Sequence, residues 1–146
     1  MSLEKLQKIR ARRLDKQLLL VQERKSQMLA AEQQLHQARQ ELEQFHHWRL
    51  NHQESLFKGL QGQTFGPEAI FEYRNTLESL GQKEEMLHVT IHQAGEQLKL
   101  AQEAYASERQ SANALAMKNE KTKEIVDIMN KEDAQLALSK ENTPEN

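Results

Sequence analysis

The chain has no cysteine and little proline or glycine, and each shortage excludes a class of structure. Without cysteine there can be no disulfide bond and no thiol chemistry, and the redox compartment stays open. The two prolines, Pro67 and Pro144, leave the long stretches before and between them uninterrupted. Proline and glycine are the residues that break helices, so long continuous helices are permitted.

Long apolar runs are also missing. No stretch approaches the roughly 18 consecutive apolar residues that a membrane-spanning helix needs. The N-terminal segment lacks an apolar stretch followed by small residues, so we expect no secretory signal. Only 37% of the 146 residues are hydrophobic and 29% are charged, which is too polar for a thick globular core. We therefore expect one cytosolic domain whose apolar surface is a thin stripe.

A hydrophobic repeat of period seven runs through the second half of the chain. Its positions are spaced alternately by three and four residues, which keeps one stripe facing a partner helix in a left-handed coiled coil. Most of them are apolar or aromatic, and the residues between them are mainly polar. The stripe consists of Ile70, Tyr73, Leu77, Leu80, Glu84, Leu87, Ile91, Ala94, Leu98, Ala101, Tyr105, Glu108, Ala112, Leu115, Asn119, Thr122, Val126 and Met129.

The first half of the chain repeats at the same period, but more weakly. Leu14, Val21, Met28, Leu35 and Leu42 are each seven residues apart. We expect the alternate positions of this stripe to be charged or polar, with long side chains that lie along the seam and keep their heads in water. Those expected alternates are Lys25, Glu32, Arg39 and His46.

One dense group of helix breakers separates the two stripes: Gly59, Gly62, Gly66 and Pro67. A short loop between two long helices favours an antiparallel pair. We therefore predict an all-α fold, a long antiparallel two-helix coiled-coil hairpin that forms one domain over residues 1–133. Ser2 would cap the first helix and Phe65 would pack on Ile70 across the start of the second. The predicted segments are helix one at about 3–58, a turn at 59–66, helix two at about 67–131 and a flexible tail at 134–146.

Charge is distributed unevenly along the chain. Residues 1–25 contain eight basic and three acidic side chains, a net charge of +5, which leaves −7 for the remainder of a chain whose total is −2. A basic end predicts something about partners rather than about the fold.

Several residues could suggest chemistry, and we expect none of it. Glu43 with His46 and Glu85 with His88 have the spacing found in carboxylate-bridged di-metal sites, but the repeat places the second pair beside the seam. His88 and His92 lie one turn apart without a third ligand on the same face. Phosphate-binding glycine loops and nucleophile elbows are also missing. We expect no enzyme activity, no metal site and no cofactor.

Nucleic-acid binding is a further alternative, because a basic segment followed by heptads is typical of basic-zipper proteins. Here the basic residues overlap the first hydrophobic positions, Leu6, Ile9 and Leu14, and a parallel dimer would leave the second heptad helix without a role. We therefore expect no nucleic-acid partner.

Aromatic residues gather near the predicted turn. A two-helix fold has one seam, so Ile70, Phe71 and Tyr73 cannot all face it. In one interpretation Phe65 and Ile70 pack together across the turn while Phe71 partly packs beneath it. In the other, the aromatic residues form an exposed contact surface beside Arg74, and the sequence leaves both interpretations open.

Taken together, these features resemble a known family. They are the basic start from Leu3-Glu4-Lys5-Leu6 to Arg12-Arg13, a glutamine-rich first helix, the turn at Gly59–Pro67, and Phe71-Glu72-Tyr73-Arg74-Asn75-Thr76-Leu77. The chain is similar over nearly its whole length to the YscO/FliJ stalk family of bacterial type III secretion and flagellar export, and the YscO branch of virulence injectisomes is closest. The resemblance rests on architecture and diffuse similarity rather than on one motif.

The resemblance implies a function. Family members are non-catalytic antiparallel coiled coils, similar to the central stalk of rotary ATP synthases, that associate with the hexameric export ATPase, contact the export-gate membrane protein and hand over secretion chaperones. It implies a cytoplasmic monomer that lies at the inner-membrane export apparatus without inserting into the membrane. By the same analogy, the end formed by both termini would enter the ATPase ring, and in this chain that end carries Lys5, Lys8, Arg10, Arg12 and Arg13. The turn-end contacts would be Phe65, Phe71, Tyr73, Arg74 and Leu77. The alternative is a generic scaffold that dimerises into a four-helix bundle.

Overall fold

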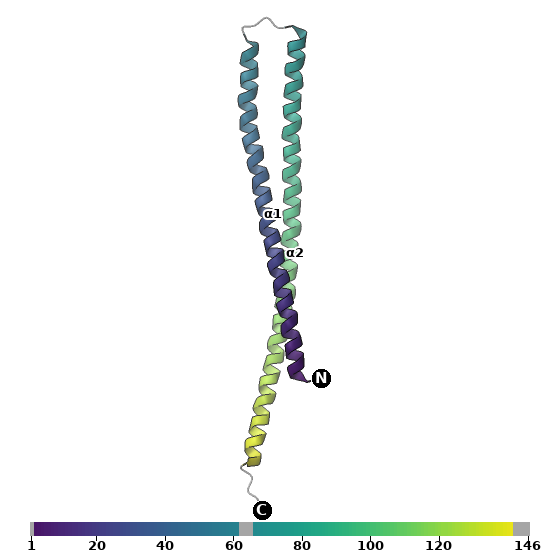
Figure 1. The fold of residues 1–146 in the computed structure, drawn as a ribbon, viewed down its shortest axis with the longest axis vertical. Helices are drawn as coiled ribbons and strands as arrows, with labels where there is room; N and C mark the ends of the chain where they lie inside the picture. The colour runs from purple at the N-terminus through teal and green to yellow at the C-terminus, as the bar shows by residue number, and fades with distance from the viewer. Residues whose placement is uncertain (1, 62–65, 142–146) are drawn as a thin grey trace, which may run out of the picture. The chain divides into compact units, whose positions relative to one another are not determined.

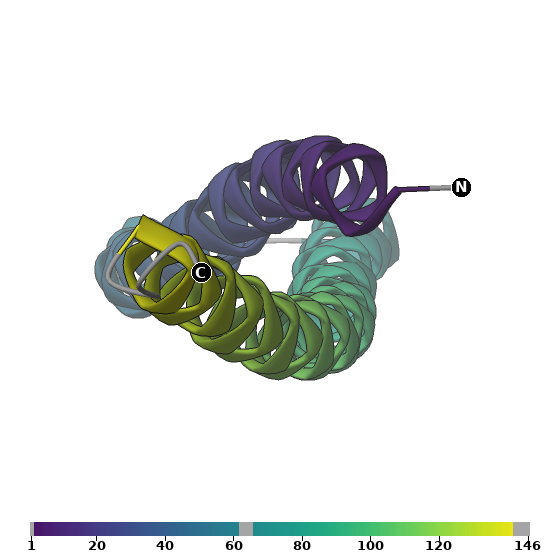
Figure 2. The ribbon, with the colours of Figure 1, turned by 90° about the horizontal axis from the view of Figure 1, so that it is seen from below.

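The computed structural model describes residues 2–61 and 66–141, which form two helices and no strand. Helix α1 spans Leu3–Leu60 and helix α2 spans Pro67–Glu141 (Figure 1). In the view from below, the described backbone likewise consists of helical coils alone (Figure 2). The predicted all-α fold with two long helices packed against each other is confirmed.

The helices form two packing units, each made of one segment from α1 and one from α2. Unit 1 comprises Met1–Ser26 and Glu103–Asn146, and unit 2 comprises Gln27–Gln102. In unit 1, Arg10 contacts Thr122 while Gln17 contacts Glu108, so rising residue numbers on α1 meet falling numbers on α2. The two segments of that unit are therefore antiparallel, as expected for a hairpin.

The helix ends follow local rules. Ser2 caps α1, because its side-chain oxygen accepts a hydrogen bond from the Lys5 backbone N–H at 3.2 Å. Pro67 is the first residue of α2, where the N–H that proline lacks would have had no helical partner. Phe65, the expected partner of Ile70 across this helix start, lies outside the described residues, and Ile70 itself is 39% exposed.

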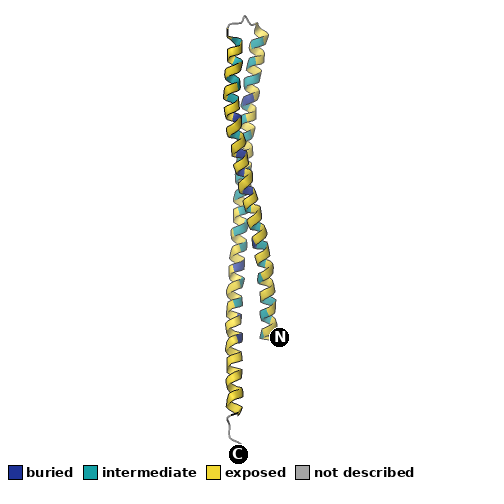
Figure 3. Ribbon diagram, turned by 60° about the vertical axis from the view of Figure 1, so that its left-hand side comes forward, coloured by how far each residue is buried: buried dark blue, intermediate teal, exposed yellow. Residues whose placement is uncertain are grey.

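The α2 stripe is confirmed over almost its full length. Every expected position from Tyr73 to Val126 is buried or partly buried. Only the two end positions, Ile70 and Met129, are exposed. Buried residues lie in a narrow line between the helices, while most of the outer surface is exposed (Figure 3). The seam is thus the hydrophobic core of each unit.

Half of the prediction for the α1 stripe was correct. All five of the expected residues seven apart, from Leu14 to Leu42, are buried or partly buried. The predicted alternates were wrong, since Lys25, Glu32, Arg39 and His46 are all exposed. The alternating positions are instead taken by Gln17, Arg24, Ala31, Ala38 and Phe45.

The physical reason is the phase of the repeat. A period of seven fits a second position either three or four residues after the first, and both choices keep one stripe along the helix. Helix α1 is rotated so that Ala31, Ala38 and Phe45 face α2, with exposures of 9%, 7% and 9%. Burying small and aromatic side chains is favourable, whereas burying the alternative charged heads would require each of them to find a partner.

Helix α2 extends further than predicted. It ends at Glu141 rather than near Lys131, so part of the expected tail at 134–146 has helical backbone. Every residue from 127 to 141 is exposed, so packing does not explain this extension. The segment is rich in Ala, Leu, Glu, Lys and Gln, which have high intrinsic helix propensity. That the end of the chain is flexible stays a prediction. Within the described ranges, no helix is long and apolar enough to span a bilayer.

The seam predicts unequal effects of two leucine substitutions in α1 of unit 2. Leu35 is 8% exposed and Leu50 is 51% exposed. We expect Leu35→Ala to lower the free energy of unfolding by about 2 kcal/mol, because it leaves a cavity between the helices. Leu50→Ala should change it by less than about 0.5 kcal/mol. Urea unfolding followed by circular dichroism measures both, and equal losses would contradict the seam.

Candidate functional site

The basic residues at the start of α1 do not all lie on the surface. Lys5, Lys8, Arg12 and Arg13 are exposed. Residues three, four and seven apart share one side of a helix, so Lys5, Lys8 and Arg12 form one outward-facing group in unit 1. We call these three residues the basic face. Four of the five cations expected at this end are therefore accessible to a partner.

Arg10, the fifth, takes a structural position. It is partly buried, and its Nη1 donates hydrogen bonds to the Thr122 hydroxyl and to the Lys118 carbonyl, the latter at 3.3 Å. Asn119 Nδ2 in turn donates to the Arg10 carbonyl at 3.1 Å. Arg10 thus joins α1 to α2 within unit 1. A role in partner binding stays a prediction for this residue, and the structure gives it another role as well.

The seam of unit 1 contains further polar groups that sequence reasoning did not identify as interhelical contacts. Gln17 Nε2 donates to the Glu108 carbonyl at 3.0 Å and also to its carboxylate. Thr122 is only 2% exposed; its hydroxyl accepts the hydrogen bond from Arg10 of α1 and donates to the Lys118 carbonyl within α2 at 2.9 Å. The one available indication was that Glu108, Asn119 and Thr122 occupy heptad positions where apolar residues are usual.

The C-terminal part of α2 adds an apolar element to unit 1. Ser2 and Leu3 lie beside Met129 and Asp133 around a hollow at the start of α1. Ile125, Ile128, Leu136 and Leu138 on α2 are each between 49% and 60% exposed. This unit therefore presents both the basic face and accessible apolar side chains.

The turn-end residues in unit 2 also separate into two groups. Phe71 is 66% exposed and Arg74 is exposed, whereas Tyr73 and Leu77 are partly buried at seam positions. Phe65 lies outside the described residues. Of the two interpretations left open for Phe71, the structure supports the exposed one.

Sequence reasoning missed Phe57 at the same end. It precedes the loop on α1 and is 52% exposed. The available indication was its position outside both heptad stripes, which leaves an aromatic side chain without a place in the seam.

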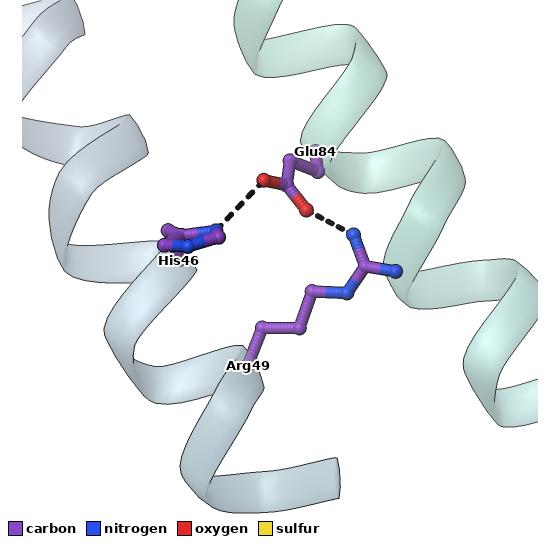
Figure 4. Close-up of polar contacts among 3 residues, drawn as sticks. All are labelled: His46, Arg49 and Glu84. Atoms are coloured by element: carbon purple, nitrogen blue, oxygen red, sulfur yellow. Dashed lines mark hydrogen bonds and ion pairs between the residues drawn. The ribbon is translucent and has the colours of Figure 1, made fainter.

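A polar group interrupts the seam of unit 2. Glu84 Oε1 lies 3.0 Å from His46 Nδ1, and its other carboxylate oxygen accepts a hydrogen bond from Arg49 (Figure 4). The side-chain hydrogen bond with His46 lowers the pKa of Glu84; burial opposes this effect, and Arg49 adds to the lowering. His46 therefore takes part in a contact between the helices, while its side chain stays half exposed and Glu43 is exposed.

The absence of a metal site stays a prediction. Within residues 2–61 and 66–141, no three His, Asp or Glu side chains are grouped so that they could hold a metal ion. Glu85, His88 and His92 are all exposed.

Comparison with known proteins identifies the family. A family model described as type III secretion protein YscO matches residues 3–144, nearly the whole chain. The chain belongs to the YscO family. It matches no curated protein and no solved structure. The basic face and the turn-end residues are therefore candidate surfaces of a YscO-family type III secretion protein.

The Glu84 group predicts a stability effect that depends on pH. Its folded-state pKa is below the ordinary value of 4.5, so the unfolded chain takes up the proton first as the pH falls. The stabilisation from Glu84 is complete above 4.5 and is lost as the pH falls through the folded-state pKa. We expect Glu84→Gln to cost about 1 kcal/mol near neutral pH and much less in strong acid. Urea midpoints across this range measure it, and a loss independent of pH would rule out the charged contact.

Proposed function

We propose that this YscO-family protein is a non-catalytic stalk of a type III secretion system. It binds the export ATPase hexamer through unit 1. Through the turn end of unit 2 it contacts the export gate and the secretion chaperones. The observation that carries the proposal is the chemical difference between the two ends. Unit 1 presents the exposed basic face, and the turn end presents exposed Phe71 and Phe57.

Electrostatic attraction suits the ATPase contact for a geometric reason. A hexameric ring presents the same surface six times, whereas a single hairpin has no sixfold symmetry. The hairpin therefore cannot make the same set of directional contacts with all six subunits. Charge attraction acts over about 8–10 Å at physiological salt and tolerates different orientations. Lys5, Lys8 and Arg12 supply that charge on the side of α1 that faces away from the seam.

Apolar side chains supply a second contribution at the same end. Ile128, Leu136 and Leu138 lie within residues 127–141, where no residue is buried, and exposed Ile125 lies just before this stretch. Without packing, the end of a long helix is held only by its own backbone hydrogen bonds and by helix propensity. Docking against the ATPase would both bury these side chains and stabilise the end of the helix.

The turn end suits a more specific contact. Phe71 is exposed beside Glu72 and above a hollow that also involves Pro67 and Glu68. Large exposed aromatic side chains next to charged residues are typical anchors of protein interfaces. Tyr73 and Leu77, which were expected to share this role, would contribute mainly by holding α2 in the seam.

The basic face can be tested by charge reversal. We expect Lys8→Glu with Arg12→Glu to weaken binding of the purified cognate ATPase at least about tenfold at low salt, with helicity unchanged. The loss should shrink as salt is raised. Lys25→Glu with Lys99→Glu is the matched control, since both lysines are exposed outside this face. Equal losses in the two double variants would contradict a specific basic contact. Arg10 is left unchanged because it joins the helices.

The turn end is tested separately. We expect Phe71→Ala to weaken binding to the cytoplasmic part of the export gate at least about tenfold, without lowering the melting temperature. Leu100→Ala is the control, because Leu100 is 58% exposed and lies on the same helix of unit 2. Calorimetric titration measures both. Unchanged binding of the Phe71 variant would remove this residue from the contact.

A further inference from the structure

One seam stripe of α1 changes from polar to apolar where unit 1 gives way to unit 2. Its members lie seven residues apart, so they share one side of the helix. In unit 1 they are partly buried and polar, namely Arg10, Gln17 and Arg24. In unit 2 they are buried and apolar, namely Ala31, Ala38 and Phe45. One continuous helix therefore contributes two different kinds of seam.

Helix α2 matches the polar stripe of unit 1 with polar groups of its own. Gln17 Nε2 donates to the Glu108 carbonyl at 3.0 Å and to its carboxylate at 2.5 Å. Arg10 donates to the Thr122 hydroxyl, and the Arg10 carbonyl accepts a hydrogen bond from Asn119 at 3.1 Å. Two levels of the unit 1 seam are thus held by hydrogen bonds, with apolar residues between them.

Hydrogen-bonded levels hold two helices together less strongly than apolar levels do. Water replaces most of the energy of a hydrogen bond when the helices separate, and a polar residue at a heptad position lowers the stability of a coiled coil. The long side chains of Arg10 and Gln17 also lose rotamer freedom in the seam. Asn119 Oδ1 is buried and accepts no hydrogen bond from the described residues, which is a further cost in the paired state.

Unit 2 buries more apolar side chains than unit 1. Among the described residues of α1, unit 2 contributes four buried apolar side chains, whereas unit 1 contributes Val21 alone. Removal of apolar surface from water is the main favourable term in pairing. Leu14 and Val21 still pack in the unit 1 seam, so this unit is paired, but with a smaller apolar contribution than unit 2.

We propose that unit 1 is a reversible clasp: residues 3–26 of α1 separate from residues 103–126 of α2 and pair again, while unit 2 stays paired. Separation is inexpensive because water satisfies the polar groups that leave the seam. Pairing returns to one register because Arg10 and Gln17 meet their partners on α2 at a single alignment. The open form presents two separate amphipathic helices, of which the α1 segment carries the basic face. The clasp is a property of the chain alone and goes beyond the proposed function.

Native-state hydrogen exchange of the full chain, without any partner, tests the clasp. Exchange is followed by mass spectrometry at urea concentrations below the unfolding transition. We expect amides of residues 3–26 and 103–126 to exchange at least about a hundredfold faster than those around Leu35 and Leu80. Their rates should rise together with urea, because opening exposes apolar surface. Fraying from the helix end would instead give rates that do not depend on urea, and would contradict the clasp.

Two double variants test whether the polar levels cause the opening. Gln17→Leu with Glu108→Leu makes one level of the seam apolar, and Gln22→Leu with Glu103→Leu makes the same chemical change at exposed positions of unit 1. We expect the first variant to slow exchange throughout unit 1 at least about tenfold and to leave unit 2 unchanged. The second should stay within about threefold of the parent chain.

Each other result overturns the inference. Equal exchange rates in the two units would show that the hairpin opens only as a whole. Equal slowing in both double variants, or no slowing in either, would show that the polar levels do not control the opening. Because no partner is present, these results are independent of the proposed function, which fails or stands by the charge-reversal and Phe71 experiments.

Discussion

The seam between α1 and α2 is the interaction on which the described structure depends, because the buried side chains of both units lie along it. Each helix contributes one side chain about every half heptad, so every layer is only two residues wide. The packing partners are correspondingly small or flat, as at Ala31, Ala38 and Ala112, whose exposures are between 6% and 9%. Burial of about 25 cal/mol per Å² over so few atoms gives each layer a modest contribution, and the stability of each unit comes from many such layers.

Polar groups in the seam determine how the helices align rather than how strongly they adhere. In unit 1, Arg10 and Asn119 hydrogen-bond to backbone carbonyls of the facing helix, and in unit 2 Glu84 meets Arg49. A shift of the helices by one turn would leave these partly buried groups without their partners, which is unfavourable. An apolar seam of Leu and Ala would tolerate such shifts more easily. The position of each polar layer therefore favours one antiparallel register within its unit.

Sequence reasoning succeeded where one physical requirement acted alone. The α2 stripe was predicted residue by residue because its three–four spacing runs without a break, and the start of α2 followed from Pro67. The alternates of α1 were wrong because a period of seven does not fix the phase. That choice depends on which side chains fit against α2. Arg10 was assigned to a partner because its charge suggested the surface, whereas its hydrogen bonds to Thr122 and Lys118 exist only once α2 lies beside it.

A thin seam also explains why candidate contact surfaces are plentiful in this chain. A globular domain buries most of its aromatic residues, but here Trp48, Phe57 and Phe71 are each at least 50% exposed because two helices offer them no second core. Such exposure carries a cost in solubility unless partners or charges cover it. Charged side chains limit that cost, with Arg49 and Glu84 beside each other in unit 2 and the basic face in unit 1. Exposed side chains outside the seam can be substituted without destabilising the fold. In a secretion component of the YscO family, binding specificity can therefore change at these positions while the hairpin stays intact.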